Sequence, residues 1–186
     1  MSEVRVAALV GSLRKDSLNR KLYNAAGKLA PPDMAITEIK GWDHWPIFNA
    51  DSVQDDGFPQ AVKQAAHEIE GADAILIVSP EYNYSVPGGL KNTIDWLSRV
   101  QPPVFADKAV AIMGASGGPV GTARMQYHLR QMLVFLDAHP VNKPEVMLGR
   151  ANEAFDSRGE LTNEVTATLV GQLLANLAIH AGRFTS

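Results

Sequence analysis

Residues 4–29 read VRVAALVGSLRKDSLNRKLYNAAGKL, and they set the pattern for the rest of the chain. The run Val4–Val10 is apolar apart from Arg5 and stops at a glycine, as a buried strand does. After the polar residues 11–17, apolar side chains recur every three or four positions over Leu18–Leu29, which is the spacing of one helix face. The stretch therefore predicts a strand, a short polar loop and a helix.

The same alternation continues to the end of the chain, and the two central apolar runs have no polar residue at all. Such runs are typical of parallel strands that are buried on both faces. Five strands that alternate with five helices predict one doubly wound α/β domain over residues 1–186, with a five-stranded parallel sheet and helices on both faces. The further strands are predicted over Ala35–Ile39, Ala74–Val78, Ala109–Met113 and Glu145–Leu148, and the further helices over Pro59–Glu70, Gly89–Arg99, Ala123–Leu136 and Glu164–Arg183.

Composition excludes several classes of function. The net charge of −3 argues against a nucleic-acid partner, which usually requires a basic excess. The chain has no cysteine, so disulfides and thiol nucleophiles are excluded, and a reducing compartment is favoured. The N-terminus lacks the basic lead-in of a signal peptide, and no apolar run approaches the length of a membrane span. We expect a soluble, cytoplasmic protein with no membrane partner.

Three loops are expected to form a ligand site, because ligands of such sheets bind beyond the carboxyl ends of the strands. The loops Gly11–Asn19, Ser79–Lys91 and Gly114–Thr122 are all rich in Gly, Ser, Asn or Pro. The first offers hydroxyl and amide donors, one arginine and a helix N-terminus, which together suit one phosphate group. Neither a GxGxxG motif nor a phosphate-loop lysine motif is present. A more ordinary role for Ser17 is that of a helix N-cap.

The second and third loops predict a site for a planar ring. Prolines stiffen the second loop, SPEYNYSVPGGLKNTIDW, and glycines in both loops allow a flat ligand to approach the backbone. Glycines that merely complete tight turns are the alternative.

The motifs GSLRKDSLN and PEYNYSVPGGLKNTIDW, in this order and spacing, resemble those of the NADPH-dependent FMN reductase family of flavodoxin-like proteins. Within that family the chain is most similar to bacterial chromate and quinone reductases. The resemblance implies that the first loop binds the FMN phosphate, the second lies against the isoalloxazine ring, and the third completes the site. The residues that it implies are Ser12, Arg14, Ser17 and Asn19, then Pro80, Glu81, Tyr82 and Asn83, then Ser116 and Gly117.

The resemblance also implies the chemistry. FMN is expected as the bound cofactor and NADPH or NADH as the electron donor, with quinones, free flavins and adventitious compounds such as chromate as acceptors. Because the flavin N5 carries the hydride, no catalytic protein side chain is required. Donor and acceptor would use the same open face in turn, which gives ping-pong kinetics.

The resemblance further implies a homodimer that pairs into a homotetramer, with the flavin near the subunit boundary. The predicted helix over residues 123–136 carries polar and aromatic side chains beside an apolar stripe. We expect Tyr84, Arg124, Tyr127 and Glu145 to form a hydrogen-bonded network across that interface, at the substrate face. A solvated helix face is the alternative.

Two other functions stay open at this level. Gly114–Gly118 satisfies the GxSxG motif of α/β-hydrolases, and Asp137, His139 and His180 follow Ser116 in the required order, although Pro119 breaks the expected strand-to-helix turn. Alternatively, the same fold serves non-enzymatic flavin carriers and sensors.

The histidines and one group of aromatic residues are expected to have structural roles. The five histidines show no metal-binding spacing, so no metal is expected. Trp42, Trp45 and Phe48 form an aromatic cluster that suits the core or a subunit interface.

Overall fold

Parallel strands in the order β2-β1-β3-β4-β5 form the central sheet of the computed structural model, which describes residues 3–55 and 57–184. This is the strand order of the flavodoxin-like doubly wound fold. The doubly wound α/β prediction is confirmed. The strands are β1 Val4–Val10, β2 Met34–Glu38, β3 Ala74–Val78, β4 Ala109–Ala115, β5 His139–Pro140 and β6 Val146–Leu148.

The fifth position of the sheet is shared by two short strands. β5 pairs with the start of β4, at Ala109 and Val110, whereas β6 pairs with its end, at residues 113–115. The sequence predicted β6 but not β5, so the sheet has six strands in five positions.

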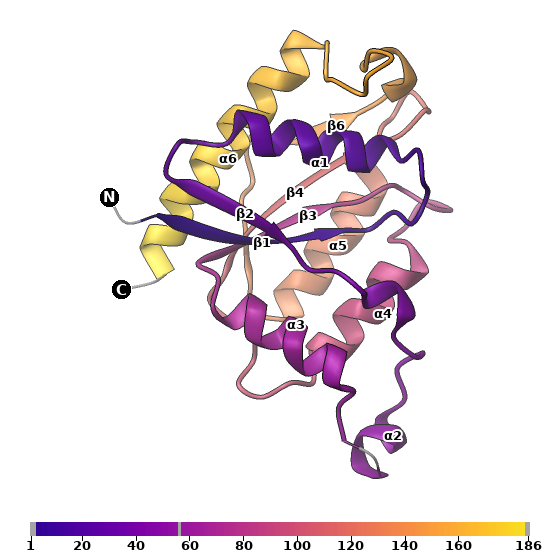
Figure 1. The fold of residues 1–186 in the computed structure, drawn as a ribbon, viewed down its shortest axis with the longest axis vertical. Helices are drawn as coiled ribbons and strands as arrows, with labels where there is room; N and C mark the ends of the chain where they lie inside the picture. Colours follow the sequence, from indigo (N-terminus) through magenta and orange to yellow (C-terminus); the bar gives the residue numbers. More distant parts are fainter. Residues whose placement is uncertain (1–2, 56, 185–186) are drawn as a thin grey trace.

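Helices cover both faces of the sheet (Figure 1). One face is covered by α3 Gln60–Glu70, α4 Gly88–Leu97 and α5 Ala123–Phe135, and the other by α1 Leu18–Leu29 and α6 Glu164–Phe184. The short helix α2 Ala50–Asp55 projects from the body of the molecule, in a segment without an apolar helix face. Two short 3-10 helices, η1 Trp42–His44 and η2 Ala151–Glu153, complete the elements of the described residues.

The core lies on both faces of β3 and β4, which are buried along their whole length. Alternate side chains of β3 point to opposite faces: Ile75 and Ile77 join the cluster under α3, α4 and α5, and Leu76 and Val78 join the cluster under α1 and α6. This is the arrangement that continuous apolar runs predict for parallel strands.

The aromatic cluster after β2 belongs to the core. Trp42 and Trp45 are buried, and Phe48 packs edge-on against Trp96 with the ring centroids 5.2 Å apart. The core reading of this cluster is therefore confirmed.

Within residues 3–55 and 57–184, one helix, α6, is long and apolar enough to cross a membrane by length and composition. The sequence predicted no membrane span. However, α6 buries Val170, Leu173, Leu174 and Leu177 in the cluster that also contains residues of β4 and α1. This buried face is that of a core helix, whereas Val165 and Ile179 are exposed.

Candidate active site

The carboxyl ends of β1, β3 and β4 lie side by side, because Val10 is in register with Val78 and Val78 with Met113. The three loops that follow these strands therefore meet at one edge of the sheet, as predicted. They enclose a cavity of about 120 Å³. All but one of the ten residues expected to bind the cofactor line it, the exception being Asn83. The lining residues are Ser12, Arg14, Ser17, Leu18, Asn19, Pro80, Glu81, Tyr82, Ala115, Ser116 and Gly117.

The first loop provides groups that suit an anion at one end of this cavity. Ser17 is the N-cap of α1, and its hydroxyl accepts a 3.2 Å hydrogen bond from the backbone N–H of Arg20. Ser12 is buried, whereas Arg14 is exposed. Among the described residues, neither the Ser12 hydroxyl nor the Arg14 guanidinium has a hydrogen-bond partner. Hydroxyls, one cation and the positive end of α1 thus converge where a phosphate could bind.

Asn19 joins the first loop to the third. Its amide donates to the carbonyl of Ala115 and accepts from the N–H of the same residue, both at 2.9 Å. The side chain is buried, and its carbonyl oxygen accepts a hydrogen bond from the last residue of β4. The structure therefore gives Asn19 a positioning role, and one amide hydrogen and one lone pair of its oxygen remain for a ligand.

The second loop folds as a tight turn at its tip. Tyr82 and Ser85 exchange backbone hydrogen bonds of 3.0 and 2.9 Å, and Asn83 and Tyr84 between them have φ values of 50° and 66°. Two central residues with positive φ characterise a type I′ turn. A tyrosine in this conformation costs on the order of 1 kcal/mol or more, so the surrounding contacts must hold it there.

Glu81 anchors this loop to α5. Its carboxylate accepts hydrogen bonds from the backbone N–H groups of Arg124 and Met125, at 2.9 and 3.0 Å, and pairs with the Arg124 guanidinium at 3.2 Å. These N–H groups belong to the first turn of α5, where a negative charge is stabilising. Glu81 was expected to contact the ring, and in the structure its carboxylate holds the loop in place.

The third loop comes close to the second through Gly114. A Cβ atom at this position would lie 2.3 Å from the carbonyl oxygen of Ser79, so no other residue fits. Farther on, the N–H of Ser116 donates to Leu148, and its carbonyl accepts from Ala151. The backbone of Ser116 is thus fixed, while Gly117 next to it is exposed and open to a ligand.

The four residues expected at a subunit interface meet in pairs within the chain. The Arg124 guanidinium lies 4.0 Å above the centre of the Tyr84 ring, and the Tyr127 hydroxyl donates a 3.0 Å hydrogen bond to Glu145. Tyr84 and Tyr127 are largely exposed beside the second loop. A role of this group in assembly stays a prediction.

The serine hydrolase alternative is wrong. Ser116 follows the carboxyl end of β4, whereas His139 pairs with Ala109 at the opposite end of the strand. Seven residues of extended chain separate the two positions by about 20 Å. His139 instead stacks on Phe184 with the ring centroids 3.9 Å apart. His139 therefore cannot join Ser116 in a catalytic triad.

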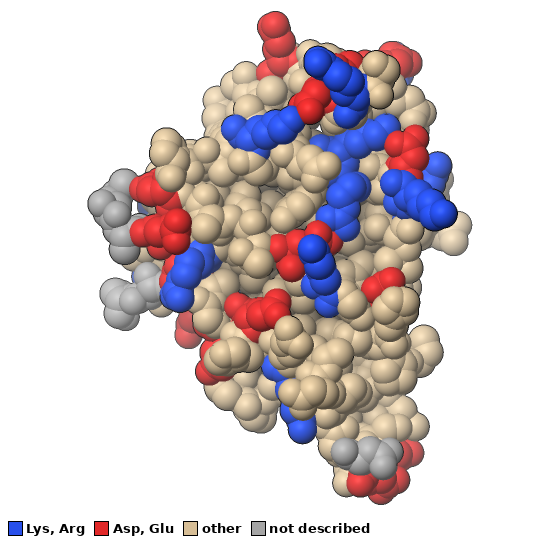
Figure 2. Space-filling view, viewed as in Figure 1, with Lys and Arg blue, Asp and Glu red and all other residues tan. Residues whose placement is uncertain are grey.

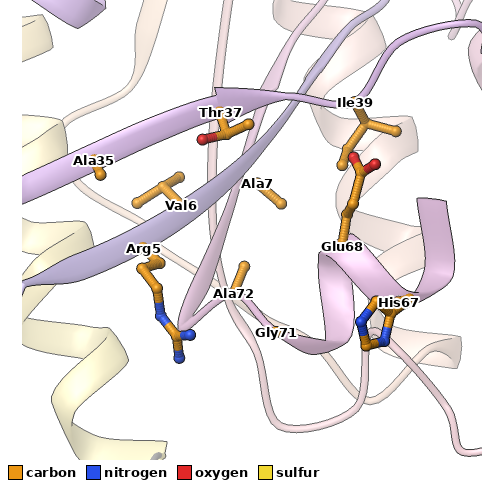
Figure 3. A pocket seen from close by; sticks show the side chains of 10 residues that line it. All are labelled: Arg5, Val6, Ala7, Ala35, Thr37, Ile39, His67, Glu68, Gly71 and Ala72. Atoms are coloured by element: carbon orange, nitrogen blue, oxygen red, sulfur yellow. The ribbon is translucent and has the colours of Figure 1, made fainter. Parts of the chain in front are cut away.

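Neither a second, larger cavity nor a metal cluster provides another candidate active site in the described residues. A cavity of about 350 Å³ lies between β1, β2 and α3, and Figure 3 shows side chains from these elements around it. Its walls are mostly apolar, and Arg5 and Ala72 place it toward the amino ends of the strands, away from the three loops. The described residues also contain no cluster of His, Asp or Glu suited to a metal ion.

The fold and the cavity enclosed by the three loops define a flavodoxin-like protein. Its site combines hydrogen-bond donors for a phosphate group with loops that suit a planar ring. The chain belongs to the NADPH-dependent FMN reductase family, whose sequence model matches residues 4–153. It is accordingly an oxidoreductase that uses FMN and NAD(P)H, and the donor set at the first loop fits the single phosphate of FMN.

Relatives of similar length support this assignment. An NAD(P)H-dependent FMN reductase of Pseudomonas aeruginosa is 47% identical over 181 residues, which cover 97% of both chains. A quinone reductase of Escherichia coli is 48% identical over 178 residues, which cover 94% of this chain and 95% of the relative. The solved flavoenzyme FerB of Paracoccus denitrificans, an NAD(P)H:(acceptor) oxidoreductase, has a TM-score of 0.87 and 33% identity, with 97% of this chain and 98% of that chain covered.

Proposed function

We propose that the protein is an FMN-dependent enzyme that transfers electrons from NAD(P)H to quinones. The carrying observation is the single cavity in which the loops after β1, β3 and β4 meet. A quinone reductase and an NAD(P)H:(acceptor) oxidoreductase among the similar proteins support the choice of acceptor. Free flavins and adventitious oxidants such as chromate are further acceptors in this proposal. These similar enzymes favour it over a non-enzymatic carrier or sensor.

In this proposal, different residues of the cavity bind the phosphate and the ring of FMN. At the phosphate end, Ser12, Arg14 and the capping turn of α1 at Ser17 would hold the FMN phosphate. At the other end, Tyr82 and Gly117 would border the ring, with Pro80, Ser116 and the turn at Asn83 shaping its surroundings. When bound, FMN supplies the hydride-accepting centre. Asn19 and Glu81 act by fixing the distances between the loops.

The proposal requires that donor and acceptor share one opening. Because loops enclose one side of the cavity, NAD(P)H and the quinone would enter in turn, each leaving before the other binds. Steady-state kinetics with NADPH and a soluble quinone test this order. We expect parallel double-reciprocal lines. Intersecting lines together with a ternary complex would contradict a shared opening, and a lack of NAD(P)H oxidation by the FMN-loaded protein would contradict the proposed function.

Assembly and location complete the proposal. We infer a homodimer that pairs into a homotetramer, with Tyr84, Arg124, Tyr127 and Glu145 at the contact near the cavity. The exposure of Tyr84, Arg124 and Tyr127 beside the second loop and the enrichment of Tyr and Arg at interface centres support this placement. The absence of cysteine in the sequence supports a location in the reducing cytoplasm.

A further inference from the structure

A second polar cavity adjoins the phosphate end of the first. It has a volume of about 320 Å³ and lies between the first loop and the segment that follows β2. Ser12 and Arg14 line both cavities, so the two are separated only by the first loop. Lys15, Lys40 and Asp43 line the second cavity but not the first.

The cations around this cavity are not all used by internal ion pairs. Arg20 is engaged, because both of its terminal nitrogens lie 2.6 Å from the carboxylate of Glu38. Arg14, Lys15 and Lys40 are exposed and have no hydrogen-bond or ion-pair partner among the described residues.

Neighbouring lysines differ in this respect, since Lys21 pairs with Asp16 and Lys28 with Glu160. Figure 2 shows Lys and Arg side chains gathered over α1 and the loop before it. The three unpaired cations, which come from two separate segments, outnumber the one further carboxylate that lines the cavity, that of Asp43, so a net positive charge borders it.

We propose that this second cavity binds the adenosine 2′-phosphate end of NADPH, with Lys15 and Lys40 recognising the 2′-phosphate. The inference rests on the proposed function and deepens it. The single phosphate of FMN accounts for Ser12, Ser17 and Arg14, but not for Lys15 and Lys40. The donor carries further phosphates, and its nicotinamide must lie at the opening of the first cavity. The second cavity is the adjoining space with unpaired cations.

This arrangement makes the enzyme prefer NADPH to NADH. The two donors differ only in the 2′-phosphate, so the side chains that contact it set the preference. Each lysine is exposed, and a single exposed ion pair contributes little. We therefore expect each alanine variant to lower kcat/KM for NADPH about 3- to 10-fold and the double variant about 10- to 50-fold, with kcat/KM for NADH changed less than 2-fold.

The test uses the FMN-loaded enzyme with Lys15→Ala, Lys40→Ala and both changes together. Lys63→Ala is the matched control, because Lys63 is an exposed lysine on α3 outside both cavities. Binding is measured separately by calorimetry with adenosine 2′,5′-bisphosphate and, for comparison, 5′-AMP. The bisphosphate should bind more tightly than 5′-AMP to the parent and to Lys63→Ala, and this difference should vanish in the double variant.

Different outcomes would contradict the role of the second cavity and the proposed function. Equal affinity of the parent for the two nucleotides, or an unchanged NADPH to NADH ratio in the double variant, overturns the inference while NADH-driven quinone reduction continues. Loss of turnover with both donors in the FMN-loaded parent contradicts the proposed function instead. If the double variant loses FMN, Lys40→Ala decides the question, because Lys40 lies after β2 and outside the first loop.

Discussion

The side chain of Asn19 and the backbone of Ala115 exchange two hydrogen bonds, each 2.9 Å long. They connect the start of α1 with the end of β4, and both residues line the cavity that the three loops enclose. The distance between the phosphate end and the ring end of that cavity therefore depends on this pair.

Replacing Asn19 by alanine should destabilise the protein. The N–H and carbonyl of Ala115 are buried, and each would lose its partner at a cost of about 1–3 kcal/mol. We expect the free energy of unfolding to fall by about 2–4 kcal/mol in urea denaturation. The control is Asn24→Ala, which removes an exposed amide on α1. Equal urea midpoints for Asn19→Ala and the control would show that the pair is unimportant.

Arg14→Ala should weaken FMN binding without unfolding the domain. The side chain is exposed at the phosphate end of the cavity, and a hydrogen bond to a charged group contributes about 1.5–3 kcal/mol. Fluorescence titration should show this loss for FMN but not for riboflavin, which has no phosphate. Arg183→Ala, at the end of α6, serves as the control. Equal losses for both flavins would mean that Arg14 shapes the site and does not contact the phosphate.

Variants of the Tyr127 group test assembly. If Tyr127 and Arg124 lie at a subunit contact beside the cavity, Tyr127→Ala and Arg124→Ala should lower the mass measured by light scattering at micromolar protein and change turnover with quinone. His67→Ala, an exposed change on α3, should alter neither. If both variants retain the mass and kinetics of the parent, the contacts of Arg124 with Tyr84 and of Tyr127 with Glu145 serve only within the chain.

Asp73 should make stability depend on pH. Burial raises its pKa, but hydrogen bonds from the Arg5 backbone and guanidinium and the charges of Arg5 and Lys108 outweigh this and hold the pKa of Asp73 below its ordinary value. A carboxyl with a lowered folded pKa stabilises the protein above its unfolded pKa of about 3.9. That stabilisation is lost as the pH falls through the folded pKa.

Asp73→Asn should therefore lower the melting temperature at pH 7, by an amount equivalent to about 1–2 kcal/mol. The difference from the parent should shrink below about pH 4. Thermal unfolding between pH 7 and pH 3 measures it, with Asp55→Asn on the exposed helix α2 as control. A difference that stays constant over this range would show that the charge of Asp73 is not involved.

Local patterns were enough to predict most of the fold. The bounds of β1, α1 and β3 agree with the sequence analysis to the residue, since an uninterrupted apolar run or a clear helix spacing defines each. β5 was missed because it is two residues long and contains a proline, and α2 because its six residues bury no side chain. Neither segment carries a periodic signal.

The site was predicted in its location but only in part in its roles. The order of the strands places the three loops together, and the motifs identify their residues. Asn19 and Glu81, however, bond to groups 96 and up to 44 residues farther along the chain. A motif does not show such partners, so a polar residue that positions a loop looks in sequence like one that binds the ligand.

The absorption spectrum of the purified protein, before and after anaerobic addition of NADPH, tests the central claim most directly. The account predicts a yellow protein with about one FMN per chain, which loses its colour with NADPH and regains it with a quinone. FAD should bind less well, because the first loop suits a terminal phosphate. A colourless protein that leaves the fluorescence of added FMN unchanged would contradict the account.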